Sequence, residues 1–97
     1  MDKNGYNPSI VQDIEQCILC GRRTGKLDRH EVFHGAYRSK SKKLGCWVWL
    51  CHEHHMQLHQ KTPDLDKNLK MFTQNVAMTH YGWTVEEFRH EFGKSYL

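Results

Sequence analysis

Long apolar runs are missing from this sequence, and so is any internal repeat or low-complexity tract. Apolar residues make up 38% of the 97 residues, and the mean hydropathy is −0.79. No run approaches the roughly 18 apolar residues of a membrane-spanning helix. The first residues, MDKNGYNPSIVQD, lack the basic-then-apolar layout of a secretory signal. We therefore expect a cytoplasmic protein that does not contact a membrane.

Cysteine and histidine are abundant by contrast, with 4 and 8 residues respectively. A small secreted chain would use the cysteines for disulfides, whereas a cytoplasmic chain more often uses them to bind metal. A chain this short also has a small hydrophobic core, so a metal ion that links separate segments would add to its stability. Six of the eight histidines fall within thirty residues: His30, His34, His52, His54, His55 and His59.

The positive charge is concentrated in one part of the chain. The net charge is +3, but the segment from Arg22 to Lys43 holds eight basic and two acidic residues. The remainder of the chain therefore carries a net charge of −3. A local basic field of this kind attracts a phosphate backbone, although solvated lysines that only confer solubility produce the same pattern.

The N-terminal half predicts a lead-in and a β-hairpin. We expect residues 1–16 to form a loose lead-in with one or two helical turns over 10–15, where turn signals give way to apolar residues. β-Branched and aromatic residues predict strands over 27–33 and 46–50. The basic, serine-rich stretch 35–45 between them reads as a long loop.

The C-terminal half predicts three helices. The first carries His55, Leu58 and His59 on one face and ends at Lys61-Thr62-Pro63. Asp64 is expected to cap a longer helix that Gly82 ends. Its core-facing stripe consists of Leu65, Leu69, Phe72, Val76 and Tyr81. A capping box, Thr84 to Glu87, opens a short helix that buries Phe88 and Phe92.

These elements define an α+β fold in three parts. Residues 1–16 form the lead-in, 17–62 form a metal-stapled ββα core, and 63–97 form a helical extension that packs on this core. The fold class follows from the order of the elements, in which a hairpin precedes all the helices.

Two ligand pairs bracket the expected hairpin. Cys17-x-x-Cys20 and Cys51-x-x-His54 each place two ligands on one turn, as tetrahedral Zn²⁺ requires. We predict that these four side chains hold a structural zinc ion. His52 is an alternative to His54, but its position next to Cys51 offers a poorer bite. The remaining Cys46 lies in the apolar second strand and is expected in the core.

The histidines that this zinc ion does not use form a second candidate centre. His55 and His59 are four residues apart on a helix, so both imidazoles can reach one ion. A third ligand has to come from another element, and the strand that carries His30 and Glu31 is expected next to this helix. His34 is also available.

Four motifs in this order resemble the HNH, or ββα-metal, nucleases, and most closely the small phage-type HNH proteins. They are Cys17-x-x-Cys20, Arg29-His30-Glu31-Val32-Phe33-x-Gly35-Ala36-x-Arg38, Gly45-Cys-Trp-Val-Trp-Leu50 and Cys51-x-x-His54-His55-x-x-x-His59. The C-terminus, Phe92 to Leu97, also resembles these proteins. The resemblance implies a hairpin and helix (a His-Me finger) that grip one divalent ion beside the scissile phosphate.

The resemblance also implies roles for individual residues. His30, His55 and His59 match the three ligands of the catalytic ion, which would be Mg²⁺, Mn²⁺, Ni²⁺ or Zn²⁺. The strand residue after the first ligand usually acts as general base and is His in the common pattern, whereas this chain has Glu31. Tyr37 likewise stands where related sequences have Asn.

Other assignments of the base remain open. In an alternative register Asp28 is the metal ligand and His30 is the base, because residues two apart on a strand face the same way. His34 is a third candidate base.

Three functions are compatible with these patterns. The first is a metal-dependent DNA endonuclease or nickase, in the host cytoplasm if phage-encoded. Basic residues would hold the backbone: Arg29, Arg38, Lys40, Lys42 and Lys43. The second is a zinc-stapled nucleic-acid-binding module without catalysis. The third is a protein-interaction domain that uses Trp47, Trp49 and Trp83, although such aromatics more often belong to a core. The oligomeric state is not indicated.

Overall fold

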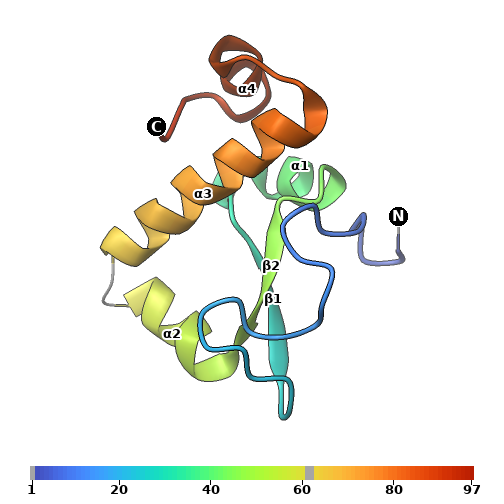
Figure 1. Ribbon diagram of the computed structural model, residues 1–97, viewed down its shortest axis with the longest axis vertical. Coiled ribbons are helices and arrows are strands. Elements are labelled where there is room, and N and C mark those ends of the chain that lie inside the picture. Colours follow the sequence, from blue (N-terminus) through green and yellow to red (C-terminus); the bar gives the residue numbers. More distant parts are fainter. Residues whose placement is uncertain (1, 61–62) are drawn as a thin grey trace.

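The computed structural model describes residues 2–60 and 63–97 and has the expected α+β class (Figure 1). A two-stranded antiparallel sheet is surrounded by helices, and all the α-helices except the shortest follow the sheet in the chain. The elements are β1 (Leu27–Glu31), a 3-10 turn η1 (Gly35–Tyr37), α1 (Arg38–Lys43), β2 (Trp47–Cys51), α2 (His52–Gln60), α3 (Pro63–Tyr81) and α4 (Val85–Phe92).

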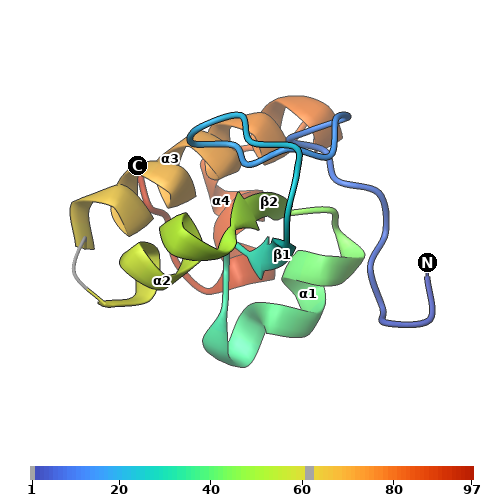
Figure 2. The same cartoon turned by 90° about the horizontal axis from the view of Figure 1, so that it is seen from below.

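Alternation along the strands gives the sheet two different faces. β1 and β2 pair antiparallel, with His30 opposite Val48 and Arg29 opposite Trp49. His30 and Val48 are buried on the face toward the core, whereas Arg29 and the tryptophans occupy the other face. α2 packs against both strands and against α3 (Figures 1 and 2).

The connection between the strands is helical, so the prediction of a loop over 35–45 was wrong. Ser41 explains the difference, because its buried hydroxyl accepts a hydrogen bond from the Phe33 amide (3.2 Å) and donates one to the Cys46 carbonyl. This single side chain ties both strand ends to α1. The basic residues of this stretch therefore project from a short, fixed helix.

The two strands lie close to their predicted positions. β1 ends at Glu31 rather than at residue 33, and β2 covers Trp47–Cys51 rather than 46–50. Val32 and Phe33 are nevertheless fully buried, because the chain enters the core as it leaves the sheet. β-Propensity alone does not separate a strand end from a buried extended segment.

The N-terminal segment runs beside β2, so the helical turns expected over 10–15 are absent. Ser9 donates a hydrogen bond to the Trp47 carbonyl (2.6 Å), and the Ile18 amide donates to the Trp49 carbonyl (2.9 Å). The Gln12 side chain accepts from the Trp49 amide (2.7 Å). These contacts cover the outer edge of β2, which would otherwise expose unpaired backbone groups.

α3 buries only part of the apolar stripe that was predicted to face the core. Leu69 is buried and Leu65 packs against the core as predicted, whereas Phe72 is 51% exposed and Tyr81 is 37% exposed. The reason is polar: the buried Gln74 side chain donates a hydrogen bond to Ser95 and accepts one from the Tyr96 amide. Anchoring the C-terminal segment in this way turns Gln74 inward and leaves Phe72 at the surface.

The predicted helix ends are confirmed only in part. Asp64 lies inside the first turn of α3, because this helix begins at Pro63. The predicted end of the preceding helix at residues 61–62 lies outside the described residues. Gly82, with φ of 68°, ends α3 as expected, and the Trp83 amide bonds back to the Met78 carbonyl.

The capping box is confirmed, and it positions the aromatic centre of the core. Thr84 and Glu87 bond each other's backbone amides at the start of α4. Phe88 and Phe92 are buried, and their rings lie 5.2 Å and 4.5 Å from the ring of Phe33. The C-terminal helices therefore close over the end of the hairpin. Within residues 2–60 and 63–97, no helix has the length and apolar character needed to cross a bilayer.

Candidate metal centres

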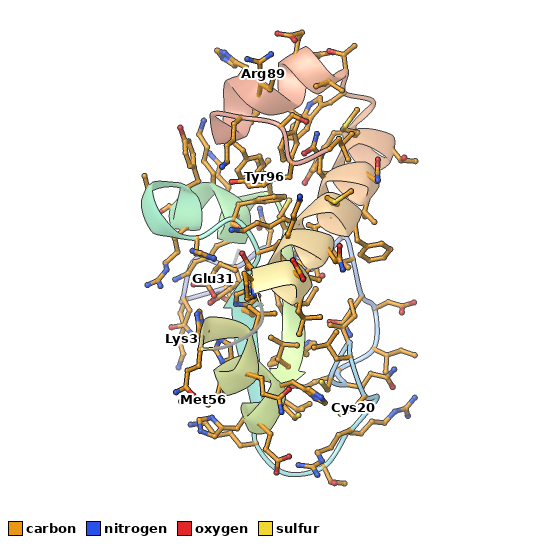
Figure 3. The ribbon with its side chains drawn as sticks, turned by 90° about the vertical axis from the view of Figure 1, so that its left-hand side faces the viewer. Lys3, Cys20, Glu31, Met56, Arg89 and Tyr96 are labelled. Carbon is orange, nitrogen blue, oxygen red and sulfur yellow. The ribbon has the colours of Figure 1, made fainter. Side chains whose placement is uncertain are left out.

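The first cluster contains three cysteines and one histidine at one end of the sheet. Cys17 and Cys20 precede β1 in a turn that Gly21 closes with φ of 75°. Cys51 ends β2 and His54 lies in the first turn of α2. Their ligand atoms all lie within 4.8 Å of one another. Cys20 marks the end of the molecule opposite Arg89 of α4 (Figure 3).

The distances within this cluster fit a tetrahedral ion. Metal–sulfur and metal–nitrogen bonds of ~2.3 Å and ~2.0 Å separate two sulfurs by about 3.8 Å, and a sulfur from a nitrogen by about 3.5 Å. The Cys20 and Cys51 sulfurs are 3.9 Å apart. His54 Nδ1 lies 3.6 Å from the Cys17 sulfur and 3.2 Å from the Cys51 sulfur. This cluster can therefore hold a metal ion.

The backbone favours the metal-binding form of Cys17. Burial raises the pKa of this thiol, but hydrogen bonds from the amides of Cys51, Cys20 and Leu19 outweigh burial and lower the pKa to about 6. A thiolate is the form that binds metal. The local turn therefore favours a negative sulfur at Cys17, which is completely buried, whereas Cys20 of the same cluster is exposed.

The other two residues considered for this cluster lie elsewhere. Cys46 is fully buried in the core, where burial raises the pKa of its thiol to about 12, so its expected role is confirmed. His52, the alternative to His54, is exposed and contacts Asp28 instead. The structure thus brings together Cys17, Cys20, Cys51 and His54, the four residues that the spacing of the two motifs favoured.

The second cluster contains three histidines from β1 and α2. His30 comes from the strand, and His55 and His59 come from successive turns of the helix. One nitrogen of each lies within 4.8 Å of the others. The Nε2 atoms of His55 and His59 are 3.2 Å apart, close to the roughly 3.3 Å between two nitrogens that share one tetrahedral ion.

The environment of His30 indicates most clearly that this cluster is suited to binding a ligand. Its side chain is 3% exposed, and its Nε2 atom is buried with no hydrogen-bond partner among the described residues. Burial, with the nearby charges of His55 and His59, lowers the pKa of His30 to about 3. A neutral imidazole is the form that binds metal, and an orphan buried nitrogen otherwise costs free energy.

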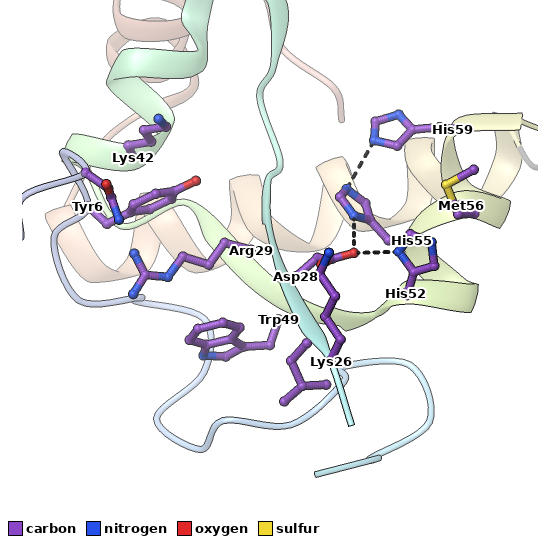
Figure 4. A pocket seen from close by; sticks show the side chains of 12 residues that line it. Tyr6, Lys26, Asp28, Arg29, Lys42, Trp49, His52, His55, Met56 and His59 are labelled. Atoms are coloured by element: carbon purple, nitrogen blue, oxygen red, sulfur yellow. Dashed lines mark hydrogen bonds and ion pairs between the residues drawn. The ribbon is translucent and has the colours of Figure 1, made fainter. Parts of the chain in front are cut away.

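Asp28 lies behind His55 rather than among the three nitrogens. Its Oδ2 atom lies 3.0 Å from His55 Nδ1 and 3.2 Å from His52 Nδ1 (Figure 4). Burial raises the pKa of Asp28, but these hydrogen bonds outweigh it and lower the pKa. The carboxylate thereby holds the His55 ring with Nε2 toward the cluster, the arrangement typical of a carboxylate–histidine–metal site.

Replacing Asp28 should therefore weaken metal binding at the three-histidine cluster. For Asp28→Asn we expect about a 10- to 100-fold loss of affinity, because the amide no longer fixes the orientation and basicity of His55. Titration with Co²⁺, followed by its visible absorption, measures the affinity. Asp13→Asn, an exposed acidic residue outside the cluster, is the matched control. Equal affinities of the two variants would contradict this role.

The candidate bases occupy different positions. Glu31 lies on the other side of β1 from His30, where its carboxylate accepts a hydrogen bond from Tyr6 (2.8 Å) and pairs with Arg38 (3.3 Å). The ring of His34 lies 6.0 Å from the ring of His30 and 6.3 Å from that of His59. The general base itself stays a prediction.

Two partners of these bases were not found by sequence reasoning. Tyr6 reaches Glu31 across 25 residues, and Asp66 lies 3.6 Å from His34 across 32 residues. Neither belongs to a motif, and no pattern in the sequence signals either contact. Only the packing of the N-terminal segment and of α3 against the hairpin brings them there.

An open depression beside the three-histidine cluster is lined by cations from several elements. It has a volume of about 770 Å³ and includes Lys26, Lys42 and Arg29 together with His55 and His59 (Figure 4). Lys26 approaches from the start of β1, whereas Lys42 approaches from α1. The depression therefore combines these cations with two of the three histidines.

The residues that were predicted to contact DNA differ in whether they already interact with other side chains of the protein. Arg29 lies over the rings of Tyr6 (4.5 Å), Trp47 and Trp49 (both 5.2 Å), and it pairs with Asp2 at 2.7 Å. Arg38 pairs with Glu31, and Lys40 with Glu91. Lys42 lies 4.8 Å from the Tyr6 ring centre, and Lys43 is exposed.

The tryptophans lie mainly within the molecule, as expected. Trp47 is 6% exposed and donates a hydrogen bond to the Asn7 carbonyl. Trp49 and Trp83 are half-buried, and Trp83 packs against the core cluster. These contacts do not favour a tryptophan-based interaction surface.

Comparison with known protein families, with characterised proteins and with solved structures finds no match to this chain. The fold and the two clusters therefore define it as a small α+β domain with two candidate metal centres, one of three cysteines and a histidine and one of three histidines.

Proposed function

We propose that this chain is a metal-dependent nuclease of the HNH type that hydrolyses phosphodiester bonds in DNA. The observation that carries the proposal is the three-histidine cluster, in which a buried, unpartnered strand nitrogen meets two helix nitrogens beside an open basic depression. Three protein ligands leave coordination positions for water and substrate, as catalytic sites require. The motif resemblance supports the same activity.

The cluster of Cys17, Cys20, Cys51 and His54 holds a structural zinc ion in this proposal. Four protein ligands complete a tetrahedral shell, and sulfur-rich sets of this kind favour zinc. Because its ligands come from the N-terminal turn, the end of β2 and the start of α2, the ion fixes the helix that carries His55 and His59. The structural ion thus positions the catalytic ligands.

The chain's own residues would bind and orient the substrate. The three histidines hold one divalent ion (Mg²⁺, Mn²⁺, Ni²⁺ or Zn²⁺), which when bound supplies Lewis-acid stabilisation of charge at the phosphate. Lys26 and Lys42 line the depression and can contact the phosphates of a bound strand. Lys43 extends this basic surface along α1. Such contacts bring affinity with little sequence preference.

A plasmid-cleavage assay tests this function. Chelated protein should leave supercoiled DNA intact, and one of the four ions should restore nicked or linear product. Cleavage should also fall as salt rises, because phosphate contacts release counterions. A His55→Ala protein purified in parallel reports any contaminating nuclease. Cleavage without ions, or none with any of them, would contradict the proposal.

A nucleic-acid-binding module without catalysis is the second candidate. It is favoured by Glu31, which stands in place of the usual histidine and is already bonded to Tyr6 and Arg38. For such a module, the same plasmid would bind in a salt-sensitive manner in a gel-shift assay and would stay intact with every ion.

A further inference from the structure

We propose that His34 is the general base of this nuclease and that Asp66 of α3 is its positioning residue. This inference rests on the proposed function, because it assigns the proton acceptor for the same reaction. It follows from where the three candidate bases lie and from a contact between the hairpin and the C-terminal helices that no sequence motif signals.

Two of the three candidate bases are already engaged. His30 is buried, and its free nitrogen belongs to the three-histidine cluster. The Glu31 side chain is only 12% exposed, and its two carboxylate oxygens are directed at Tyr6 and Arg38. Both carboxylate oxygens are therefore already bonded, on the face of β1 away from His30.

His34 has the position and access that the role requires. Its side chain is 40% exposed, and it lies three residues beyond the end of β1, just before η1. Its ring stands beside the rings of His30 and His59, at 6.0 Å and 6.3 Å between centres. It lies outside the set of nitrogens that share one ion. An imidazole at this position could accept a proton from a water molecule beside the cluster.

Asp66 supplies the second, independent observation. Its Oδ1 atom is buried with no hydrogen-bond partner among the described residues, and it lies 3.6 Å from His34 Nε2. Its Oδ2 atom pairs with Lys70 at 2.8 Å, so the carboxylate is fixed in place. Lys70 in turn lies over the ring of Tyr96. The buried Oδ1 atom is thus held toward His34, and it makes no hydrogen bond to any described residue.

The step balances with water as the only co-reactant. The imidazole of His34 takes one proton from water while the water oxygen forms a bond to phosphorus. The bond from phosphorus to the leaving sugar oxygen breaks, and that oxygen takes a proton from solvent. Asp66 accepts the hydrogen bond of the protonated ring, which keeps the other nitrogen toward the phosphate.

Steady-state cleavage by single variants tests this assignment. For His34→Ala we expect kcat to fall about 10²- to 10⁴-fold, with KM and metal content unchanged. For Asp66→Asn we expect a loss of about 10- to 100-fold. Added imidazole should restore part of the activity of His34→Ala and should leave Asp66→Asn and His55→Ala unchanged. His90→Ala and Asp64→Asn, which change exposed residues on α4 and α3, are the matched controls.

The outcomes separate this inference from the proposed function. If the wild-type protein cleaves and His34→Ala cleaves equally well, or if Glu31→Gln loses more activity than His34→Ala, His34 is not the base although the nuclease stands. Loss of metal from His34→Ala would make it a ligand and likewise overturn the assignment. If the wild-type protein cleaves with no ion at all, both proposals fall.

Discussion

Replacing Cys51 with Ser is expected to unfold the chain. Structural zinc contributes about 10–16 kcal/mol of apparent binding free energy in small domains, and a domain of this size has a net stability of only about 5–15 kcal/mol. Cys51 also ends β2 at the point where α2 begins, so the proposed zinc ion would join the sheet, the helix and the N-terminal turn through its sulfur. Loss of one ligand removes most of this coupling.

Circular dichroism during heating measures the effect, and Cys46→Ala is the matched control. Both thiols are buried, with exposures of 2% and 0%, but the Cys46 thiol lies outside the cluster. We expect Cys46→Ala to stay folded with a slightly lower Tm. Chelation of the wild-type protein should unfold it reversibly, and added Zn²⁺ should refold it. A chelated protein that keeps its Tm would contradict a structural ion.

Many of the correct predictions concern residues that lie only three or four positions apart in the sequence. The ligand pairs lie three or four residues apart, and at that distance a turn or a helix fixes which side chains meet. The capping box at Thr84 and Glu87 was confirmed for the same reason. In each case the structure needed only the local backbone geometry, which the residue types determine.

The errors come from side chains whose partners lie outside the three- or four-residue spacing of a turn or helix. Ser41 turns an expected loop into a helix because it bonds to both strand ends. Gln74 is buried while Phe72 of the predicted stripe is exposed, because Gln74 anchors the C-terminal segment. The contact between His34 and Asp66 likewise depends on how α3 packs against the hairpin. A single sequence holds no local signal for such pairings, because they depend on tertiary packing.

His55→Ala is expected to lose the catalytic ion while the fold stays intact. The His55 side chain is 22% exposed and reaches the cluster from the first turns of α2. The proposed structural zinc ion would hold these turns independently through His54. Two ligands, His30 and His59, bind a divalent ion weakly. Cleavage should then fall about 10³-fold or more, because the Lewis-acid contribution of several kcal/mol to the barrier is lost.

Metal analysis and cleavage together identify this outcome. The wild-type protein should hold two ions per chain and His55→Ala one, with similar Tm values, whereas Cys51→Ser should lose its fold. His80→Ala, which removes an exposed histidine in the last turn of α3, is the matched control and should keep both ions. One ion in both proteins, with equal activity, would show that the three histidines bind no metal. The two clusters therefore make opposite predictions, because the proposed zinc ion would maintain the fold and the proposed catalytic ion only the reaction.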